Sequence, residues 1–279
     1  MDLNQIYNID CSQYMQSLPD GCVNLVIADP PYGISKQKAF LGYSHGVIRG
    51  MDEKWDIFNS EEEYLIFTRR WLNQVKRILV ENGSILVWGN YRSIFNVQKC
   101  LEETGMYYKG LVAWVKRDAP PNVTRRSYAL STEYILWYCR SEKGWVFNHD
   151  DLKKLNNGKQ MRDFWDIPRT MTKREHTRHR TQKKYETAER IVVGHSRKND
   201  IVYIPFAGSG TEIEACIKNG RNWLATEMDQ QYINEIILPR IGQGTRQSVE
   251  QLFTVAKKTR SQQIIFFKCR LLKHKTSDT

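Results

Sequence analysis

The residues that could do chemistry begin with Asp29-Pro30-Pro31-Tyr32, which brings together a carboxylate, free carbonyls and an aromatic ring. The preceding apolar run, Val23 to Ala28, is too short for a helix and rich in β-branched residues, so it is predicted to be a buried strand. Proline lacks an N–H and consecutive prolines favour extended backbone, so no helix uses these carbonyls. Asp29 and the Pro30 carbonyl could therefore both accept hydrogen bonds from one exocyclic amine. A plain turn after a strand is the alternative.

A second motif, Phe206-Ala207-Gly208-Ser209-Gly210-Thr211, lies between an apolar run at Ile201 to Ile204 and a helical stretch at Glu212 to Asn219. This order is typical of cofactor binding, because glycines let the backbone approach a ligand and the first helical turn offers unpaired N–H groups. Glu227 ends the next predicted strand, about twenty residues further on, where an acid can bind both hydroxyls of a ribose. The loop lacks the lysine of a phosphate cradle, so a nucleoside cofactor without a pyrophosphate is expected.

Together these residues resemble the amino methyltransferases that use S-adenosylmethionine to methylate DNA bases. Asp-Pro-Pro-Tyr is similar to the catalytic motif of that family and Phe-x-Gly-x-Gly to its cofactor motif. Their order resembles the permuted beta class, mostly adenine-N6 enzymes of restriction–modification systems. The resemblance extends over residues 4–241. Within the class the chain looks most similar to the small enzymes that read GATC, judged from residues 119–122, 131–133 and 158–161.

The resemblance implies a set of site residues. The catalytic residues would be Asp29, Pro30, Pro31 and Tyr32, with Tyr32 stacked on a base extruded from the duplex. The cofactor would be S-adenosylmethionine, and no metal would be needed. The residues implied to bind the cofactor are Asp10, Cys11, Asp29, Thr181, Gln182, Lys183, Phe206, Gly208, Ser209, Gly210 and Glu227. Ile204 stands where the family usually has Asp, and a charge-assisted hydrogen bond lost there would weaken cofactor binding by about 1–3 kcal/mol.

The rest of the chain predicts a doubly wound α/β domain. Helices are predicted at 61–79, 91–104 and 184–195, and strands at 84–88, 110–115 and 133–138, with Asn82-Gly83 ending the first helix. The resemblance implies a Rossmann-like methyltransferase sheet, mostly parallel with an antiparallel edge strand, in a domain of residues 1–241. Residues 242–279 form a basic C-terminal extension, expected to be an added edge strand, a dimer contact or a DNA-binding tail.

The charge of the chain favours a polyanionic partner. It has 42 Lys and Arg against 31 Asp and Glu, a net charge of +11. Basic residues concentrate in 116–126 and 151–180, which match by position the target-recognition region of the permuted class, an insertion at about 116–180. The DNA-binding residues predicted there are Asn122, Arg125, Arg126, Lys159, Arg162, Arg174 and Arg178. The glycine-rich stretch at 33–56 is expected to be a lid over the pocket. A solvated basic face is the alternative.

Composition also bounds the class of protein. No run of about eighteen apolar residues and no signal-peptide pattern occurs, so a soluble cytoplasmic protein without membrane contact is expected. The six cysteines have no paired spacing, which argues against a disulfide framework and against a zinc site. A homodimer is implied only by the resemblance.

The mechanism follows from the chemistry of an aromatic amine. The lone pair of adenine N6 is delocalised into the ring, and acceptors at Asp29 and Pro30 would free it and stabilise the positive charge that develops as methyl leaves the sulfonium. A methyltransferase acting on cytosine N4 or on RNA remains open. A function of another class also remains open, that of a DNA-binding protein whose transferase site has decayed. The reason for this alternative is Ile204, which stands where the family usually has Asp.

Overall fold

In the computed structural model, the described residues are 1–33, 56–122, 124–169, 177, 179 and 181–242, together with the backbone of 40–41 and 47–48. The chain divides into two units, Met1–Ile237 and Leu238–Thr279. The described part of the second unit contains helix α8 (Leu238–Ile241). The extension predicted at 242–279 lies outside the described residues except for Gly242.

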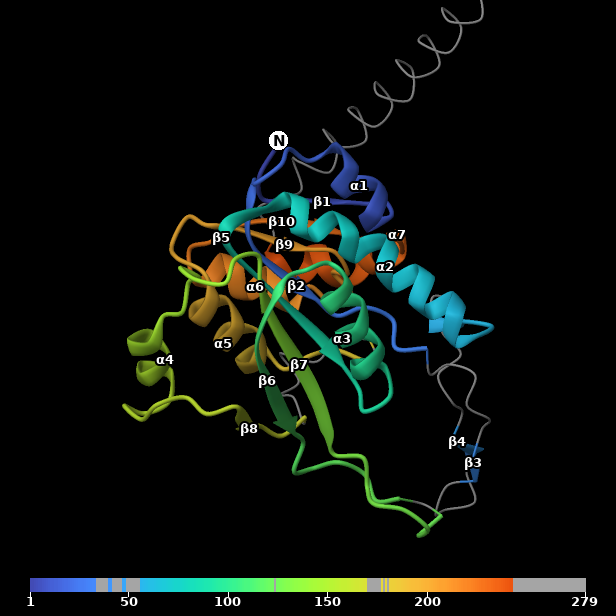
Figure 1. Ribbon diagram of the computed structural model, residues 1–279. Coiled ribbons are helices and arrows are strands. Elements are labelled where there is room, and N and C mark those ends of the chain that lie inside the picture. Colours follow the sequence, from blue (N-terminus) through green and yellow to red (C-terminus); the bar gives the residue numbers. More distant parts are fainter. Residues whose placement is uncertain are drawn as a thin grey trace, which may run out of the picture. The chain divides into compact units, whose positions relative to one another are not determined.

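An eight-stranded sheet forms the centre of the first unit (Figure 1). Its order is β1-β10-β9-β2-β5-β7-β6-β8. The strands are β1 (Gln5–Tyr7), β2 (Val23–Ala28), β5 (Leu79–Gly89), β6 (Tyr107–Val115), β7 (Thr132–Cys139), β8 (Phe164–Asp166), β9 (Ile201–Ile204) and β10 (Asn222–Thr226). A short antiparallel pair, β3 (Phe40–Leu41) and β4 (Val47–Ile48), falls in the predicted lid. Most of that lid lies outside the described residues.

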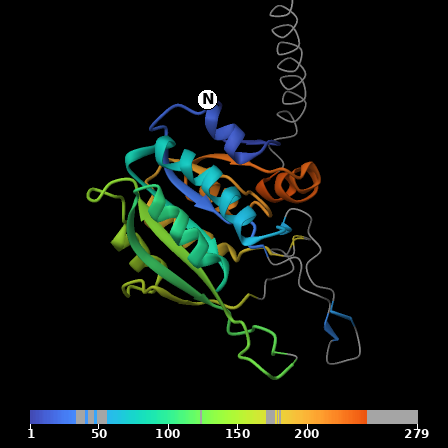
Figure 2. The same cartoon turned by 45° about the vertical axis from the view of Figure 1, so that its right-hand side comes forward.

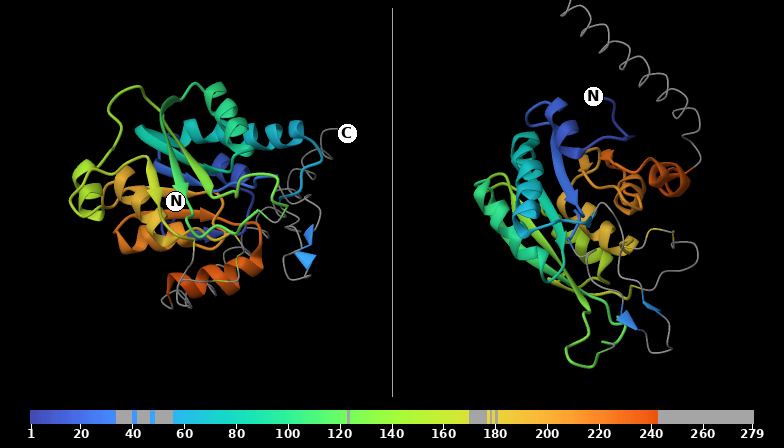
Figure 3. Two further views of the ribbon diagram at one scale, coloured as in Figure 1. Left: turned by 90° about the horizontal axis from the view of Figure 1, so that it is seen from below. Right: turned by 90° about the vertical axis from the view of Figure 1, so that its right-hand side faces the viewer.

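Helices cover both faces of the sheet (Figures 2 and 3). Helices α1 (Cys11–Ser17), α2 (Glu61–Ile78) and α3 (Ser93–Glu103) pack side by side on one face, and α4 (His149–Leu155), α5 (Tyr185–His195) and α6 (Thr211–Lys218) on the other. The short α7 (Gln230–Tyr232) continues into a π-helical turn at Ile233–Ile237. The doubly wound α/β class is confirmed.

Strand β7 runs antiparallel to both of its neighbours, β5 and β6, whereas the other pairings in this sheet are parallel. The antiparallel strand therefore lies inside the sheet and not at an edge, which corrects that detail of the expected fold. On β7, Ile135, Leu136 and Tyr138 are at most 1% exposed, whereas Tyr107 and Tyr108 on β6 are 45% and 52% exposed. Both strands have a neighbour on each side, and β7 is the more buried of the two.

The prediction that Asn82-Gly83 ends the first helix is also wrong, because α2 ends at Ile78 and β5 begins at Leu79 and runs through both residues. The register between β2 and β5 shifts there: Val23 pairs with Leu79, but Leu25 pairs with Ser84. A Cβ on Gly83 would lie 2.9 Å from the Val80 carbonyl oxygen, closer than side chains tolerate. Asn82-Gly83 therefore belongs to an irregularity within the strand, where glycine allows a close backbone approach.

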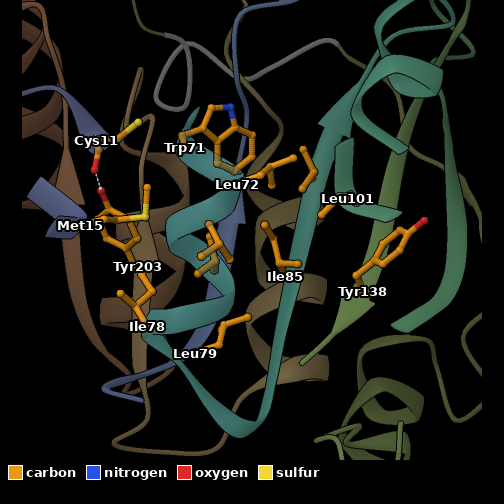
Figure 4. Close-up of a cluster of buried hydrophobic side chains, with 14 of the residues drawn as sticks. Cys11, Met15, Trp71, Leu72, Ile78, Leu79, Ile85, Leu101, Tyr138 and Tyr203 are labelled. Carbon is orange, nitrogen blue, oxygen red and sulfur yellow. Dashed lines mark hydrogen bonds between the residues drawn. The ribbon is translucent and has the colours of Figure 1, made fainter. Parts of the chain in front are cut away.

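The core between the sheet and helices α1, α2 and α3 is a cluster of buried apolar side chains (Figure 4). It includes Met15 of α1, Trp71 and Leu72 of α2, Leu101 of α3 and Tyr203 of β9, all fully buried. Burying a large apolar side chain stabilises a fold by about 1.5–3 kcal/mol. The buried residues of α2 therefore form part of this core.

The direction of the strands brings distant parts of the chain together at the carboxyl ends of the strands, which is called the carboxyl edge of the sheet here. Strands β2, β5, β6, β9 and β10 point the same way, so their carboxyl ends lie together. The catalytic tetrapeptide follows β2, the glycine motif follows β9, and Glu227 follows β10. Loop 116–131 follows β6 and leads into β7. Ligands of open α/β sheets bind at this edge.

The interval 116–180, predicted to be a target-recognition insertion, contains two strands of the central sheet, β7 and β8. The described residues outside these strands form loop 116–131, helix α4 and its flanking loops. Their role in recognising DNA stays a prediction.

Candidate active site

A cavity of about 550 Å³ lies at the carboxyl edge of the sheet. Its volume is within the range of small-molecule sites, about 300–1,000 Å³. Twelve of the predicted site residues line it: Asp10, Cys11, Asp29, Pro30, Pro31, Tyr32, Thr181, Lys183, Phe206, Gly208, Ser209 and Glu227. Gln182 and Gly210, which were also predicted, are not among the lining residues. The two predicted motifs therefore share one cavity.

Asp29 lies just beyond the end of β2 with both carboxylate oxygens engaged. Its Oδ1 accepts a hydrogen bond from the Tyr32 hydroxyl at 2.7 Å, and its Oδ2 is 2.9 Å from Lys183 Nζ. Burial raises the pKa of Asp29 above its ordinary value, although the Lys183 ammonium acts in the opposite direction. The site thus holds a carboxylate in a fixed orientation and in partly dry surroundings, which strengthens its interaction with a donor.

Glu133, at the start of β7, joins this group and was not predicted. Its Oε2 is 3.1 Å from Lys183 Nζ and its Oε1 is 2.8 Å from Lys116 Nζ. Burial alone would raise the pKa of Glu133, but the two ammonium groups outweigh burial and lower it to about 2. The signal available in the sequence was a carboxylate on an otherwise apolar strand, where a charge is seldom buried without a partner.

Asp56 fixes the backbone at the end of the tetrapeptide and was also missed. This side chain is buried, and its Oδ1 accepts hydrogen bonds from the N–H of Tyr32 at 2.6 Å and of Gly33 at 2.7 Å. Gly33 has a φ of 70°, a left-handed conformation that favours glycine. Hydrogen bonds to an ionised carboxylate are stronger than neutral ones, so Asp56 holds Tyr32 firmly in place.

The glycine motif approaches its neighbours closely. Gly208 donates its N–H to Glu227 Oε2 at 2.8 Å, and a Cβ on Gly208 would lie 3.2 Å from His179 Nε2. Gly210, with a φ of 73°, packs instead against Ile237. Burial raises the pKa of Glu227 above its ordinary value. Glu227 therefore lines the cavity while it orders the loop, whereas Gly210 serves the packing behind the loop.

The segment before α5 places two of its three predicted residues at the cavity. Thr181 and Lys183 line the cavity, and Gln182 turns back to accept hydrogen bonds from the N–H and the hydroxyl of Thr177 at 2.9 and 2.7 Å. The ring of His179 lies 4.9 Å from the ring of Tyr232, and both residues line the cavity. Gln182 therefore shapes this segment and does not face the ligand space.

At the other side of the cavity, Asp10 caps helix α1. Its carboxylate accepts hydrogen bonds from the N–H groups of Ser12 and Gln13, both at 3.1 Å, and lies 2.7 Å from Arg70 Nη2. Burial raises the pKa of the adjacent Cys11 thiol to about 12, so this thiol is not a nucleophile. Ile204 is buried at the end of β9 and is not among the lining residues.

The predicted DNA-binding residues are divided between two regions. Asn122, Arg125 and Arg126 lie in loop 116–131, and Lys159 and Arg162 lie between α4 and β8. The four basic residues are exposed, whereas the Asn122 side chain bonds to Ser127 and Thr124 within its own loop. Arg174 and Arg178 lie outside the described residues. Contact of these residues with DNA stays a prediction.

Among the described residues, no group of three or more His, Cys, Asp or Glu is arranged to hold a metal ion. In the same part of the chain, no helix has the length and apolar character needed to cross a membrane.

Comparison with known sequences gives consistent results. The DNA methylase family profile, which covers N6 and N4 enzymes, matches residues 23–238. The chain is 30% identical over 231 residues to the type II methyltransferase M2.MboI of Moraxella bovis, a match that covers 82% of this chain and 84% of that protein. It is also 30% identical over 239 residues to the type II methyltransferase M.HinfI of Haemophilus influenzae, covering 83% of this chain and 67% of that protein.

Comparison with solved structures agrees. The M1.HpyAVI complex with SAM is 27% identical with a TM-score of 0.63, and the match covers 86% of this chain and 99% of that chain. The cytosine-N4-specific PvuII DNA methyltransferase has a TM-score of 0.69 at 17% identity, covering 88% of each chain, which shows a shared fold.

Proposed function

The chain belongs to the DNA methylase family, and from this premise we propose that it methylates adenine N6 within a short DNA motif. It is a DNA methyltransferase of restriction–modification type that uses S-adenosylmethionine. The observation that carries the proposal of amine methylation is the Asp29 carboxylate, which faces the same cavity as the glycine motif. The resemblance to the GATC-reading enzymes supports GATC as the motif.

The residues that line the cavity fit S-adenosylmethionine. Six carboxylate residues and one lysine line it, which suits a ligand that carries a sulfonium and an amine. Glu227 would bind the ribose, Asp10 and Cys11 would hold the adenine, and Thr181 would lie at the methionine end. When bound, the cofactor supplies an electrophilic methyl group. Ile204 does not line the cavity, so it provides no direct contact to the cofactor.

The chain's own residues orient the target amine and stabilise the charge that develops on it. Asp29 and the Pro30 carbonyl accept from the amine hydrogens, which directs the nitrogen lone pair towards the methyl group. The Tyr32 hydroxyl, bonded to Asp29 Oδ1, keeps the carboxylate in this orientation. After transfer the nitrogen carries one proton too many. Asp29 is the base that accepts it, since burial raises its pKa.

Adenine is proposed over cytosine because residue 29 is Asp, where cytosine-N4 enzymes of the family more often have Ser. The fold does not distinguish adenine from cytosine as the target base, since a cytosine-N4-specific enzyme shares it. The amine of either base could approach the same carboxylate.

The test is expression in a host that lacks its own methylases, followed by sequencing of its DNA and RNA for modified bases. We expect N6-methyladenine at one short motif, and none when Asp29→Ala is expressed. Methylcytosine at the motif would contradict adenine specificity. Unmodified DNA from cells that contain folded, cofactor-binding protein would contradict the proposed function.

A further inference from the structure

The ammonium group of Lys183 occupies the place where the amine of a substrate is expected to bind. Its Nζ is 2.9 Å from Asp29 Oδ2 and 3.1 Å from both the Tyr32 hydroxyl and Glu133 Oε2. The rings of Tyr32 and Trp88 lie 5.1 and 5.2 Å from this nitrogen. An ammonium has three donors. Each of them has an acceptor here, and the side chain is only 4% exposed.

This arrangement opposes methyl transfer. The target nitrogen gains positive charge as its bond to the methyl group forms, and it needs Asp29 as an acceptor. A cation held on Asp29 repels that charge and occupies one carboxylate oxygen. Lys183 does not escape by losing its proton: burial lowers its pKa, but Asp29 and Glu133 outweigh burial and keep it above its ordinary value.

The two carboxylates that contact Lys183, Asp29 and Glu133, differ in their surroundings. Glu133 Oε2 faces Lys183 and Glu133 Oε1 faces Lys116. The carboxylates of Asp29 and Glu133 and the two ammonium groups therefore form a set with no net charge. The pKa of Glu133, lowered to about 2 against the effect of burial, keeps it ionised at neutral pH. Asp29 has the opposite tendency, since burial raises its pKa. Because Asp29 lines the cavity and Glu133 does not, Glu133 is the lasting partner of Lys183, and Asp29 is the carboxylate that a substrate can reach.

We propose that Glu133 is a positioning residue for methyl transfer, which holds Lys183 and neutralises its charge while Asp29 receives the target amine. This inference rests on the proposed function and adds a second carboxylate to the site. Glu133 does not line the cavity, so it acts through Lys183 and not on the substrate. Lys183 already lies between the two carboxylates, so only a small shift frees Asp29.

The first experiment replaces Glu133 by glutamine, which keeps the shape and removes the charge. Glu133→Gln is expected to lower the single-turnover methylation rate, at saturating cofactor and duplex DNA, by at least about 100-fold. The dissociation constants for S-adenosylmethionine and DNA should stay within about threefold of the parent's. Glu142→Gln, an exposed position beyond the other end of β7, is the matched control. A Glu133→Gln rate within about threefold of the parent's would overturn the proposal.

The second experiment removes the cation as well. In the Glu133→Gln background, Lys183→Met eliminates the uncompensated charge, so the double variant should be at least about tenfold faster than Glu133→Gln at saturating cofactor. A purely structural role for Glu133 gives no such recovery. A double variant no faster than Glu133→Gln would overturn the charge-compensation role.

Melting temperatures of the parent, the two single variants and the double variant make a test that does not depend on catalysis. If Glu133 neutralises the charge of Lys183, the double substitution lowers Tm by less than the sum of the decreases caused by Glu133→Gln and Lys183→Met alone. Additive losses would overturn the pairing. A parent protein that transfers no methyl group contradicts the proposed function, and the melting comparison then still decides the pairing.

Should Glu133→Gln not fold, Glu133→Asp keeps the charge and should retain at least about a tenth of the parental rate. A folded but inactive Glu133→Asp would overturn the proposal.

Discussion

At the scale of single residues, the site is built from charges that satisfy one another before any ligand binds. Lys183 connects Asp29, Tyr32 and Glu133, and Asp56 holds the backbone of Tyr32 and Gly33. Each of these groups is at least partly buried, where an unpaired charge would be costly. The catalytic carboxylate is therefore oriented by the protein, and a shift of Lys183 frees it for a target amine.

The charge of Glu133 predicts a pH dependence of stability. Its pKa in the folded protein is about 2, below the value of about 4.3 expected in the unfolded chain. The carboxylate therefore contributes stability above pH ~4.3, and the contribution is lost as pH falls towards ~2. Thermal melts of the parent and Glu133→Gln at stepped pH measure this. The difference in Tm should be largest near neutrality and shrink through this window, and a difference that is constant with pH would contradict the prediction.

At the scale of elements, Asp56 joins the two ends of the segment predicted to be a lid. It follows residues 34–55 in sequence and binds the N–H groups of Tyr32 and Gly33, which precede that segment. The anchor holds the backbone of the tetrapeptide, whereas Lys183 contacts its side chains. Asp56 and strand β2 thus position the same loop.

Replacing Asp56 by Ala should therefore disturb both stability and catalysis. Each N–H left without an acceptor costs about 1–3 kcal/mol, so the free energy of unfolding should fall by that order, with a lower methylation rate in the folded fraction. Chemical denaturation and single-turnover assays measure the two effects. Asp163→Ala, an exposed carboxylate before β8, is the control. Unchanged stability in Asp56→Ala would show that Asp56 is not an anchor.

Loop 116–131 leaves β6 at the edge of the sheet where the cavity lies, and it carries Arg125 and Arg126. If these residues bind phosphates, the Arg125→Ala/Arg126→Ala variant should bind all DNA sequences more weakly, with a salt slope reduced by about one for each phosphate that is no longer bound. Arg197→Ala/Lys198→Ala is a matched control, because these exposed residues precede β9 at the opposite edge. Fluorescence anisotropy at several salt concentrations measures both variants. Equal salt slopes for both would contradict the prediction.

At the scale of the whole molecule, the cavity depends on segments from both ends of the first unit. Asp10 and Cys11 lie near its start and Glu227 near its end, and β1 pairs with β10 to bring them together. A ligand that contacts both ends should therefore stabilise the unit as a whole. Ligand binding to the folded state alone raises stability by about 2.7 kcal/mol at a hundred times its dissociation constant.

S-adenosylmethionine is thus expected to raise the Tm of the parent in a concentration-dependent way. Gly208→Ala should reduce this shift strongly, because Gly208 has a φ of 48° and an added Cβ would press on the His179 ring. Gly220→Ala is a control, since this glycine also has a positive φ but has no atom near the added Cβ. Differential scanning fluorimetry measures the shifts, and equal shifts in the two variants would contradict a close approach of cofactor at Gly208.

Local patterns in the sequence predicted the strands that precede the motifs and Glu227, namely β2, β9 and β10. They did not predict Glu133 or Asp56 at the site, because these roles depend on contacts across long stretches of chain, from Tyr32 to Glu133 and from Tyr32 to Asp56. The inner position of β7 was missed for a similar reason. Pairing order depends on contacts among all the strands of the sheet, which no single segment shows.

The most direct measurement of the central claim is single-turnover transfer of a labelled methyl group from S-adenosylmethionine to duplex DNA by the parent and by Asp29→Asn. Asp150→Asn, an exposed carboxylate far along the chain, serves as the control. We predict that, at saturating cofactor, Asp29→Asn binds DNA like the parent but transfers the methyl group at least about 100-fold more slowly, because the amine loses its charged acceptor. Transfer by Asp29→Asn at the parental rate would contradict the assignment of Asp29 and of the site built around it.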